Sequence, residues 1–149
     1  SNLFTNHIYY WGDQHYGLTM GSDRATRMDA CGTAKRIGVP FTIHSDAPVR
    51  PLDPLFTAWC AVNRQTASGR ILGPNECIEV DDALRAITLG AAYTLHLDHL
   101  IGSIESGKFA DFAVLEQDPT ELPAENLKDV QVWGTVVDGI ARPASGSGA

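Results

Sequence analysis

The stretch Phe41-Thr-Ile-His44-Ser-Asp46-Ala-Pro-Val49 decides the fold of this 149-residue chain. Its first four residues have the composition of a short buried strand, which ends in His, Ser and Asp before a proline stops it. Upstream, residues 22–37 place small and apolar side chains on one helical face, with Ser22 as the expected N-cap and Gly38 as the stop. Residues 3–11, rich in aromatic and β-branched side chains, predict another buried strand. Strand, helix and strand in this order indicate a βαβ unit with a parallel sheet.

Helices are predicted to follow this unit. The first begins near Pro54, because apolar residues recur after it at helical spacing: Leu55, Phe56, Trp59 and Val62. Residues 64–75 contain Gly and Pro punctuation and predict an exposed loop. The clearest helix is expected over residues 82–95, with acids at its start where the helix dipole favours them.

The period changes from helical to extended after Gly102. Residues 111–115 and 130–137 predict two strands, the first of them buried, and residues 117–126 a connecting loop. Asp138-Gly139 is a hairpin turn signal that returns the chain through residues 140–142. The end of the chain is therefore expected to be β-rich and antiparallel.

These elements divide the chain into an α/β portion, residues 1–100, and a small β portion, residues 101–143. Residues 144–149 are expected to be a disordered tail, because their small side chains cannot offset the entropy of ordering. A parallel sheet of two strands is implausible alone in water, since both its faces and edges need cover. The pattern therefore predicts a fragment or an obligate assembly.

Composition excludes several classes of protein. The chain is 44% hydrophobic and 19% charged, with a formal net charge of -7 and no basic stripe, so nucleic acid is a poor partner. No stretch approaches the ~18 apolar residues of a membrane helix. The cysteines, Cys31, Cys60 and Cys77, form no CxxC pair, so we expect inert thiols and a reducing, cytoplasmic setting.

Asp46 is the first candidate for chemistry. In parallel α/β barrels the active site lies beyond the carboxyl ends of the strands, where Asp46 falls. A carboxylate there can bind a divalent metal and accept a proton from a metal-bound water. The alternative is that Asp46 caps its own turn, as Asp often does before proline. His44 lies two residues earlier and shares a face with Asp46 if the strand continues through both; it is either a partner in the site or a packing residue.

Other histidines carry weaker signals. His7, in Asn6-His7-Ile-Tyr-Tyr-Trp-Gly-Asp13, would reach substrate near Asp46 if the two predicted strands are neighbours; otherwise it is a satisfied histidine in an aromatic strand. His96 and His99 lie three apart at a predicted helix end, where histidine more often interacts with the helix dipole than with a metal.

Two motifs resemble the amidohydrolase superfamily. Residues 101–115, Ile-Gly-Ser-Ile-Glu-Ser-Gly-Lys-Phe-Ala-Asp-Phe-Ala-Val-Leu, resemble its G-S-I/L-x-x-G-K-x-A-D-x-x-V-L signature, and His44-Ser-Asp-Ala-Pro-Val49 resembles the end of the last barrel strand in the amidohydrolase-3 branch. Residues 6–13 are similar to the penultimate strand of that branch, which includes N-substituted formamide deformylase. The resemblance covers nearly the whole chain.

The resemblance implies the C-terminal part of a (β/α)8 TIM barrel beside part of a small β-sandwich. It makes Asp46 a metal ligand and proton shuttle. The family does not make His44 a standard ligand, and contact of His7 and His44 with substrate is our own hypothesis. This chain has no counterparts of the family's other metal ligands, which are a His-x-His, a bridging Lys or Glu, and later His residues. The complete enzyme is expected to hold zinc, but this chain by itself is not expected to hold a metal tightly.

The main hypothesis is therefore a metal-dependent amidohydrolase that acts on non-peptide C–N bonds of a small amide or cyclic amide in the complete protein. This chain alone is expected to be an inactive fragment that needs an N-terminal portion or forms a homo-oligomer. The rival is a noncatalytic interaction module that assembles through exposed sheet edges.

Overall fold

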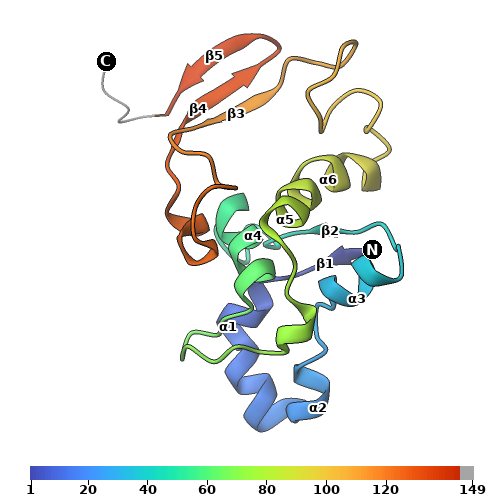
Figure 1. The fold of residues 1–149 in the computed structure, drawn as a ribbon, viewed down its shortest axis with the longest axis vertical. Helices are drawn as coiled ribbons and strands as arrows, with labels where there is room; N and C mark the ends of the chain where they lie inside the picture. The colour runs from blue at the N-terminus through green and yellow to red at the C-terminus, as the bar shows by residue number, and fades with distance from the viewer. Residues whose placement is uncertain (145–149) are drawn as a thin grey trace.

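The computed structural model describes residues 1–144 and places a helical body below a small antiparallel sheet (Figure 1). The α-helices are α1 (Asn6–Gln14), α2 (Ser22–Ala25), α3 (Cys31–Arg36), α4 (Pro54–Asn63), α5 (Val80–Ile87) and α6 (Leu89–Thr94). There are also a π-helix, η1 (His15–Thr19), and two 3-10 helices, η2 (Pro74–Glu76) and η3 (Ala124–Asp129). The strands are β1 (Asn2–Leu3), β2 (Thr42–Ile43), β3 (Phe112–Leu115), β4 (Val132–Val137) and β5 (Ile140–Pro143). Within residues 1–144, none of the helices combines the length and apolar character needed to cross a lipid bilayer.

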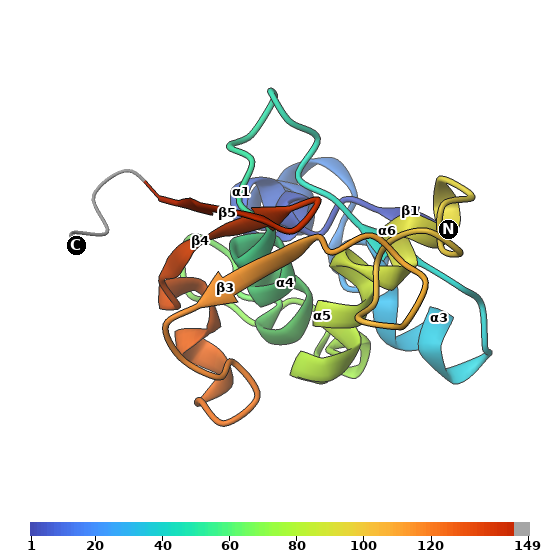
Figure 2. The same ribbon diagram turned by 90° about the horizontal axis from the view of Figure 1, so that it is seen from above.

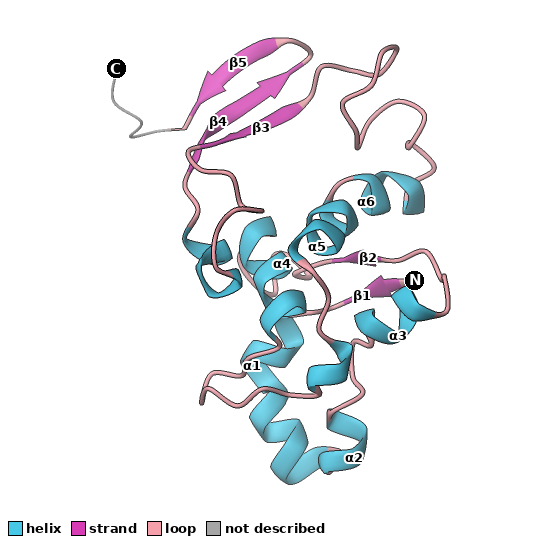
Figure 3. Cartoon of the chain, in the orientation of Figure 1, coloured by secondary structure: helices cyan, strands magenta, loops and turns pink. Residues whose placement is uncertain are grey.

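The predicted βαβ unit is confirmed. β1 and β2 are parallel neighbours that lie side by side inside the helical body (Figure 3), and the His44 N–H extends the pairing by donating to the Leu3 carbonyl at 3.0 Å. β2 is buried, and its Thr42 hydroxyl donates to the Ala86 carbonyl of α5 at 2.8 Å. This hydrogen bond fixes the strand that leads to Asp46 against the helices.

The core is centred on α4, as its apolar pattern predicts. Seven of its residues are buried, and they pack against Ile43 of β2, against α5 and against the turn η3. The Trp59 indole N–H donates to the Glu125 carbonyl at 2.9 Å, which satisfies the one polar atom of this large side chain. The helix begins where Asp53 accepts the Phe56 N–H at 3.0 Å, an N-cap with proline in the first turn.

The strand predicted over residues 3–11 is wrong beyond its first residue. β1 ends at Leu3, and α1 begins at Asn6. Aromatic composition favours a strand, but the buried positions Thr5, Ile8 and Gly12 repeat at helical spacing and decide the outcome. His7 therefore lies in the first turn of a helix rather than at a strand end.

The single helix predicted over residues 22–37 is two helices, with Gly21 rather than Ser22 at the N-cap of α2. Asp29 breaks it with a left-handed backbone, φ 46°, and its carboxylate accepts the Phe4 N–H at 3.0 Å. The predicted stop at Gly38, φ 70°, is confirmed.

The loop predicted over residues 64–75 is exposed at residues 67–71 and 74–75 but not throughout. Arg64 and Leu72 are fully buried at its two ends. Arg64 adopts a left-handed backbone, φ 47°, and donates to three carbonyl oxygens: Leu72 at 2.6 Å, Met28 at 2.8 Å and Asp29 at 2.9 Å. A charged residue after a helix predicts solvent exposure, and only the tertiary structure supplies these acceptors.

The helix predicted over residues 82–95 begins earlier, at Val80, and is interrupted at Thr88, where α5 gives way to α6. The Thr88 hydroxyl donates back to the Leu84 carbonyl at 2.8 Å, a bond that competes with helix continuation. The interruption brings Gly90 against β2, where a Cβ would lie 2.6 Å from the Phe41 carbonyl oxygen.

The antiparallel ending is confirmed, with strand order β3-β4-β5 and a hairpin turn at Asp138-Gly139. The sheet lies apart from β1 and β2 in both views (Figures 1 and 2). The prediction that residues 111–115 are buried is wrong, because Ala113 and Val114 are exposed on a sheet that no second sheet covers within residues 1–144. The tail prediction falls on residues 145–149, which lie outside the described residues.

Candidate functional site at the end of β2

Asp46 lies three residues beyond β2, at the carboxyl end of the parallel pair. Its backbone is left-handed, φ 56°, a conformation in which Asp is tolerated better than most residues. The turn closes where the Val49 N–H donates to the Asp46 carbonyl at 2.8 Å. Because Ser45 is buried and Asp46 exposed, the turn presents the Asp46 side chain to solvent at the strand end.

The Asp46 carboxylate itself is free of protein partners. Within residues 1–144 it accepts no hydrogen bond and forms no ion pair, whereas Asp53 in the same connection caps α4. The capping role considered for Asp46 is therefore not what the structure shows. A carboxylate that has no structural partner at this position is available to bind a cation or accept a proton.

His44 is oriented by its neighbour. The Asp46 N–H donates to His44 Nδ1 at 3.1 Å, so in the neutral imidazole the proton resides on Nε2. On its other side the ring stacks on Phe4, with centroids 5.2 Å apart. His44 therefore presents an N–H donor from a fixed ring.

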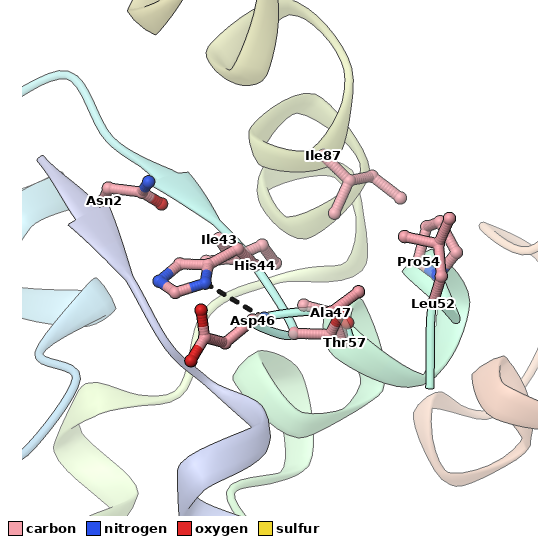
Figure 4. A pocket seen from close by; sticks show the side chains of 10 residues that line it. Asn2, Ile43, His44, Asp46, Ala47, Leu52, Pro54, Thr57 and Ile87 are labelled. Atoms are coloured by element: carbon pink, nitrogen blue, oxygen red, sulfur yellow. Dashed lines mark hydrogen bonds between the residues drawn. The ribbon is translucent and has the colours of Figure 1, made fainter. Parts of the chain in front are cut away.

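Both side chains border a cleft of about 390 Å³. Figure 4 shows the His44 ring and the Asp46 carboxylate on the same side of the strand end, with Leu52, Pro54 and Ile87 on the other side. The structure thus brings together two of the three residues predicted for the site. The cleft is lined by five apolar and five polar residues, so an apolar wall faces a polar one.

His7 does not line this cleft. Its ring lies one aromatic residue away from His44, stacked on Phe4 with centroids 5.1 Å apart. His7 Nε2 is 3.0 Å from His15 Nε2, and His15 Nδ1 is 2.6 Å from the Thr19 hydroxyl. Burial, and then the charge of His15, lower the pKa of His7. The sequence contained His15, but only the helix places it beside His7.

Two residues that the sequence did not identify support the site from behind. Asp29 holds the Phe4 N–H, and Arg64 holds the Asp29 carbonyl. Burial raises the pKa of the Asp29 carboxyl to about 6, and the Phe4 N–H and Arg64 oppose this rise. The ring that stacks on both histidines is thereby connected to the buried interior.

The described residues do not fit a complete metal centre. Catalytic zinc uses about three protein ligands and an open position, but residues 1–144 contain no group of three or more His, Cys, Asp or Glu side chains arranged to hold a metal. His96 and His99 lie in exposed turns after α6. Asp46 can supply one ligand, and the others would have to come from outside the described residues.

The fold is similar to that of solved metal-dependent hydrolases. The chain is similar to a metal-dependent hydrolase from Pyrococcus horikoshii OT3, with a TM-score of 0.66 and 22% identity over 83% of this chain and 25% of that one. It is also similar to an amidohydrolase from Thermotoga maritima MSB8, with a TM-score of 0.54 and 25% identity over 74% of this chain and 25% of that one. The mixed α/β fold is therefore that of a part of such hydrolases.

Sequence comparison then gives the family. Residues 2–140 match the amidohydrolase family, so the chain belongs to it. It is 38% identical to N-substituted formamide deformylase of Arthrobacter pascens, over 70% of this chain and 19% of that protein. It is 32% identical to the putative amidohydrolase YtcJ of Bacillus subtilis (strain 168), over 80% of this chain and 23% of that protein. The chain thus spans about a fifth of the curated relatives it matches.

Proposed function

We propose that this chain supplies part of the active site of a metal-dependent amidohydrolase that cleaves a non-peptide C–N bond of a small amide or cyclic amide. The observation that carries the proposal is the free Asp46 carboxylate at the carboxyl end of a parallel strand, beside a cleft. Membership of the amidohydrolase family supports the reaction class. Alone, the chain is expected to be inactive, because it contributes one metal ligand.

Asp46 has two proposed roles, metal ligand and general base. One carboxylate oxygen can bind a divalent metal, for which zinc is the proposed identity, while the other accepts a proton from the attacking water. The absence of a competing hydrogen bond within residues 1–144 leaves both oxygens available for these roles. The remaining ligands of such a metal would lie outside the described residues.

The histidines are proposed to contact substrate. His44 donates through Nε2–H, because Nδ1 already accepts the Asp46 N–H, and such a donor can stabilise a carbonyl oxygen as charge develops on it. His7 is one ring farther along the same wall and would meet a more distant part of the substrate.

The finer architecture is proposed on the same basis. β1 and β2 would be the last two strands of a (β/α)8 barrel, residues 1–100 the barrel portion, and residues 101–143 the C-terminal strands of a β-sandwich. The two parallel strands and the uncovered antiparallel sheet support this division. The three free thiols are compatible with a cytoplasmic setting.

The test is the Asp46→Asn variant of the complete enzyme. Loss of the base should lower kcat by at least about 10²-fold while circular dichroism and the thermal midpoint stay unchanged. Bound metal, measured by elemental mass spectrometry, should fall with it. A fully active variant would refute the assignment. Asp53→Asn, at the acid of the same connection that caps α4, is the matched control and should leave both kcat and stability unchanged, because the Asn side chain can still accept the Phe56 N–H.

A noncatalytic module is the second candidate, favoured by one observation. β3 and β5 are both edge strands of the three-stranded sheet, and edges of this kind pair with other chains. Light scattering of the purified chain tests it: association that weakens when proline replaces Val114 of β3 would support pairing through that edge, and a monomer would refute it.

A further inference from the structure

Arg50 is a half-buried cation that has no counter-ion among residues 1–144. Among the arginines of residues 1–144, Arg50 alone is half-buried and Arg64 alone is buried, and the others are exposed. Arg64 donates to three carbonyl oxygens. Arg50 forms no hydrogen bond and no ion pair with the described residues, and its Nε lies buried without an acceptor. A half-buried guanidinium normally has an acceptor, so its absence points to a missing partner.

Arg50 is held in place by aromatic rings rather than by acids. Its Cζ lies 4.0 Å from the centroid of the Tyr10 ring and 4.2 Å from that of Trp11, both on α1. The two ring centroids are only 5.9 Å apart and the rings are tilted by 58° to each other, so both rings contact the guanidinium from neighbouring sides rather than from its two opposite faces. Nε is the buried donor, and the two Nη groups donate to none of the described residues. They form the fork that suits a carboxylate.

This cation belongs to the same surface as the proposed reaction centre. The turn closed by Asp46 and Val49 brings the chain to Arg50, and the loop between β2 and α4 projects on the side of α1 (Figure 2). The Trp11 ring that holds Arg50 contacts the His7 ring, with centroids 4.9 Å apart. Rings of Phe4, His7 and Trp11 thus form a continuous wall from His44 to the guanidinium.

We infer that Arg50 is the binding site for a carboxylate of the substrate, so that the amides taken by this site carry an acid group at one end. This inference rests on the proposed function and specifies its substrate class. The acids of the same connection do not compete, because Asp53 caps α4 and Asp46 forms no ion pair with Arg50. In a chain of net charge -7, an unpaired and immobilised cation is a selective position for an anion.

The test is a binding measurement on the 149-residue chain that requires no turnover. N-acetylglycine and its neutral counterpart N-acetylglycinamide are titrated while the indole N–H resonance of Trp11 is followed by NMR. We expect saturable shifts with the acid and at least ~10-fold weaker binding of the amide. Equal binding of the two compounds by the wild-type chain would overturn the inference.

Variants locate the effect. Arg50→Gln should weaken N-acetylglycine binding by ~10-fold, and Arg50→Lys should restore part of it, because the charge returns without the fork. Arg24→Gln, at an exposed arginine of α2, is the matched control and should bind as wild type does. Unchanged binding by Arg50→Gln would refute the site. In the complete enzyme, Asp46→Asn should abolish turnover and leave the binding of N-acetylglycine intact. Turnover therefore tests the role of Asp46, and binding tests the role of Arg50, each independently of the other.

Discussion

Replacing Arg64 by Met should be the most destabilising change of a charged residue in this chain. The side chain is fully buried and satisfies three carbonyl oxygens, two from the Met28-Asp29 turn and one from Leu72. Methionine fills a similar volume but donates nothing. Three buried acceptors would lose a charged donor, at about 1 kcal/mol or more each, so the free energy of unfolding should fall by about 3–5 kcal/mol.

Urea unfolding followed by tryptophan fluorescence measures this loss as a lower midpoint at an unchanged slope. Arg24→Met, at an exposed arginine, is the matched control and should stay within about 0.5 kcal/mol of wild type. A loss below about 1 kcal/mol for Arg64→Met would show that the three carbonyl oxygens find other donors.

Three further predictions use the same chain. Burial raises the pKa of Asp29 from 3.8 to about 6. The folded chain therefore keeps this proton to higher pH than the unfolded chain, and the contribution of Asp29 to stability falls as pH rises between these values. Urea titrations of Asp29→Asn should lack this fall, and a pH profile identical to that of the wild type would contradict it. Gly73→Ala should cost about 2–4 kcal/mol in thermal unfolding, because its Cβ would lie 1.9 Å from a carbonyl oxygen at φ 68°, while Gly17→Ala, with nothing within 4 Å, should be neutral or stabilising. His15→Gln should raise the pKa of His7 without restoring it to 6.5, because burial is the larger cause; histidine ring resonances in NMR report this shift, and no change would refute the coupling.

The sequence predicted those parts of the fold that depend on local signals. A few neighbouring residues decide each of these patterns: the buried β2, the start of α4 at Pro54, the stop at Gly38 and the final hairpin. The order of the first elements was enough to infer a parallel pair.

The errors occurred where distant segments decide the outcome. Composition favoured a strand at His7, but a helix buries Thr5 and Ile8 against residues far along the chain, as the Thr5 hydroxyl bond to the Thr57 carbonyl at 2.9 Å illustrates. Asp29 breaks a helix that periodicity made continuous, because Phe4 and Arg64 bind it there. Such partners are invisible in the local sequence.

The candidate site divides in the same way. Asp46 could be predicted from its position after a strand end. His44 was paired with it by strand alternation, but β2 ends at Ile43, and it is the turn at Asp46 that brings the two residues to one cleft. Arg50 could not, because its significance depends on the lack of an acid partner among the described residues and on two rings from α1. His15 likewise becomes relevant only when the helix turns it toward His7.

A network of hydrogen bonds and stacked rings explains how the described residues fix the end of β2. Arg64 holds the turn at Asp29, Asp29 holds the Phe4 N–H, and the Phe4 ring stacks on His44, which accepts the Asp46 N–H. Each step lies within the described residues, so the orientation of the strand end does not depend on a bound metal. Arg64→Met should therefore loosen the His44 ring even at denaturant concentrations where the chain remains folded, whereas removal of metal from the complete enzyme should leave that ring in place.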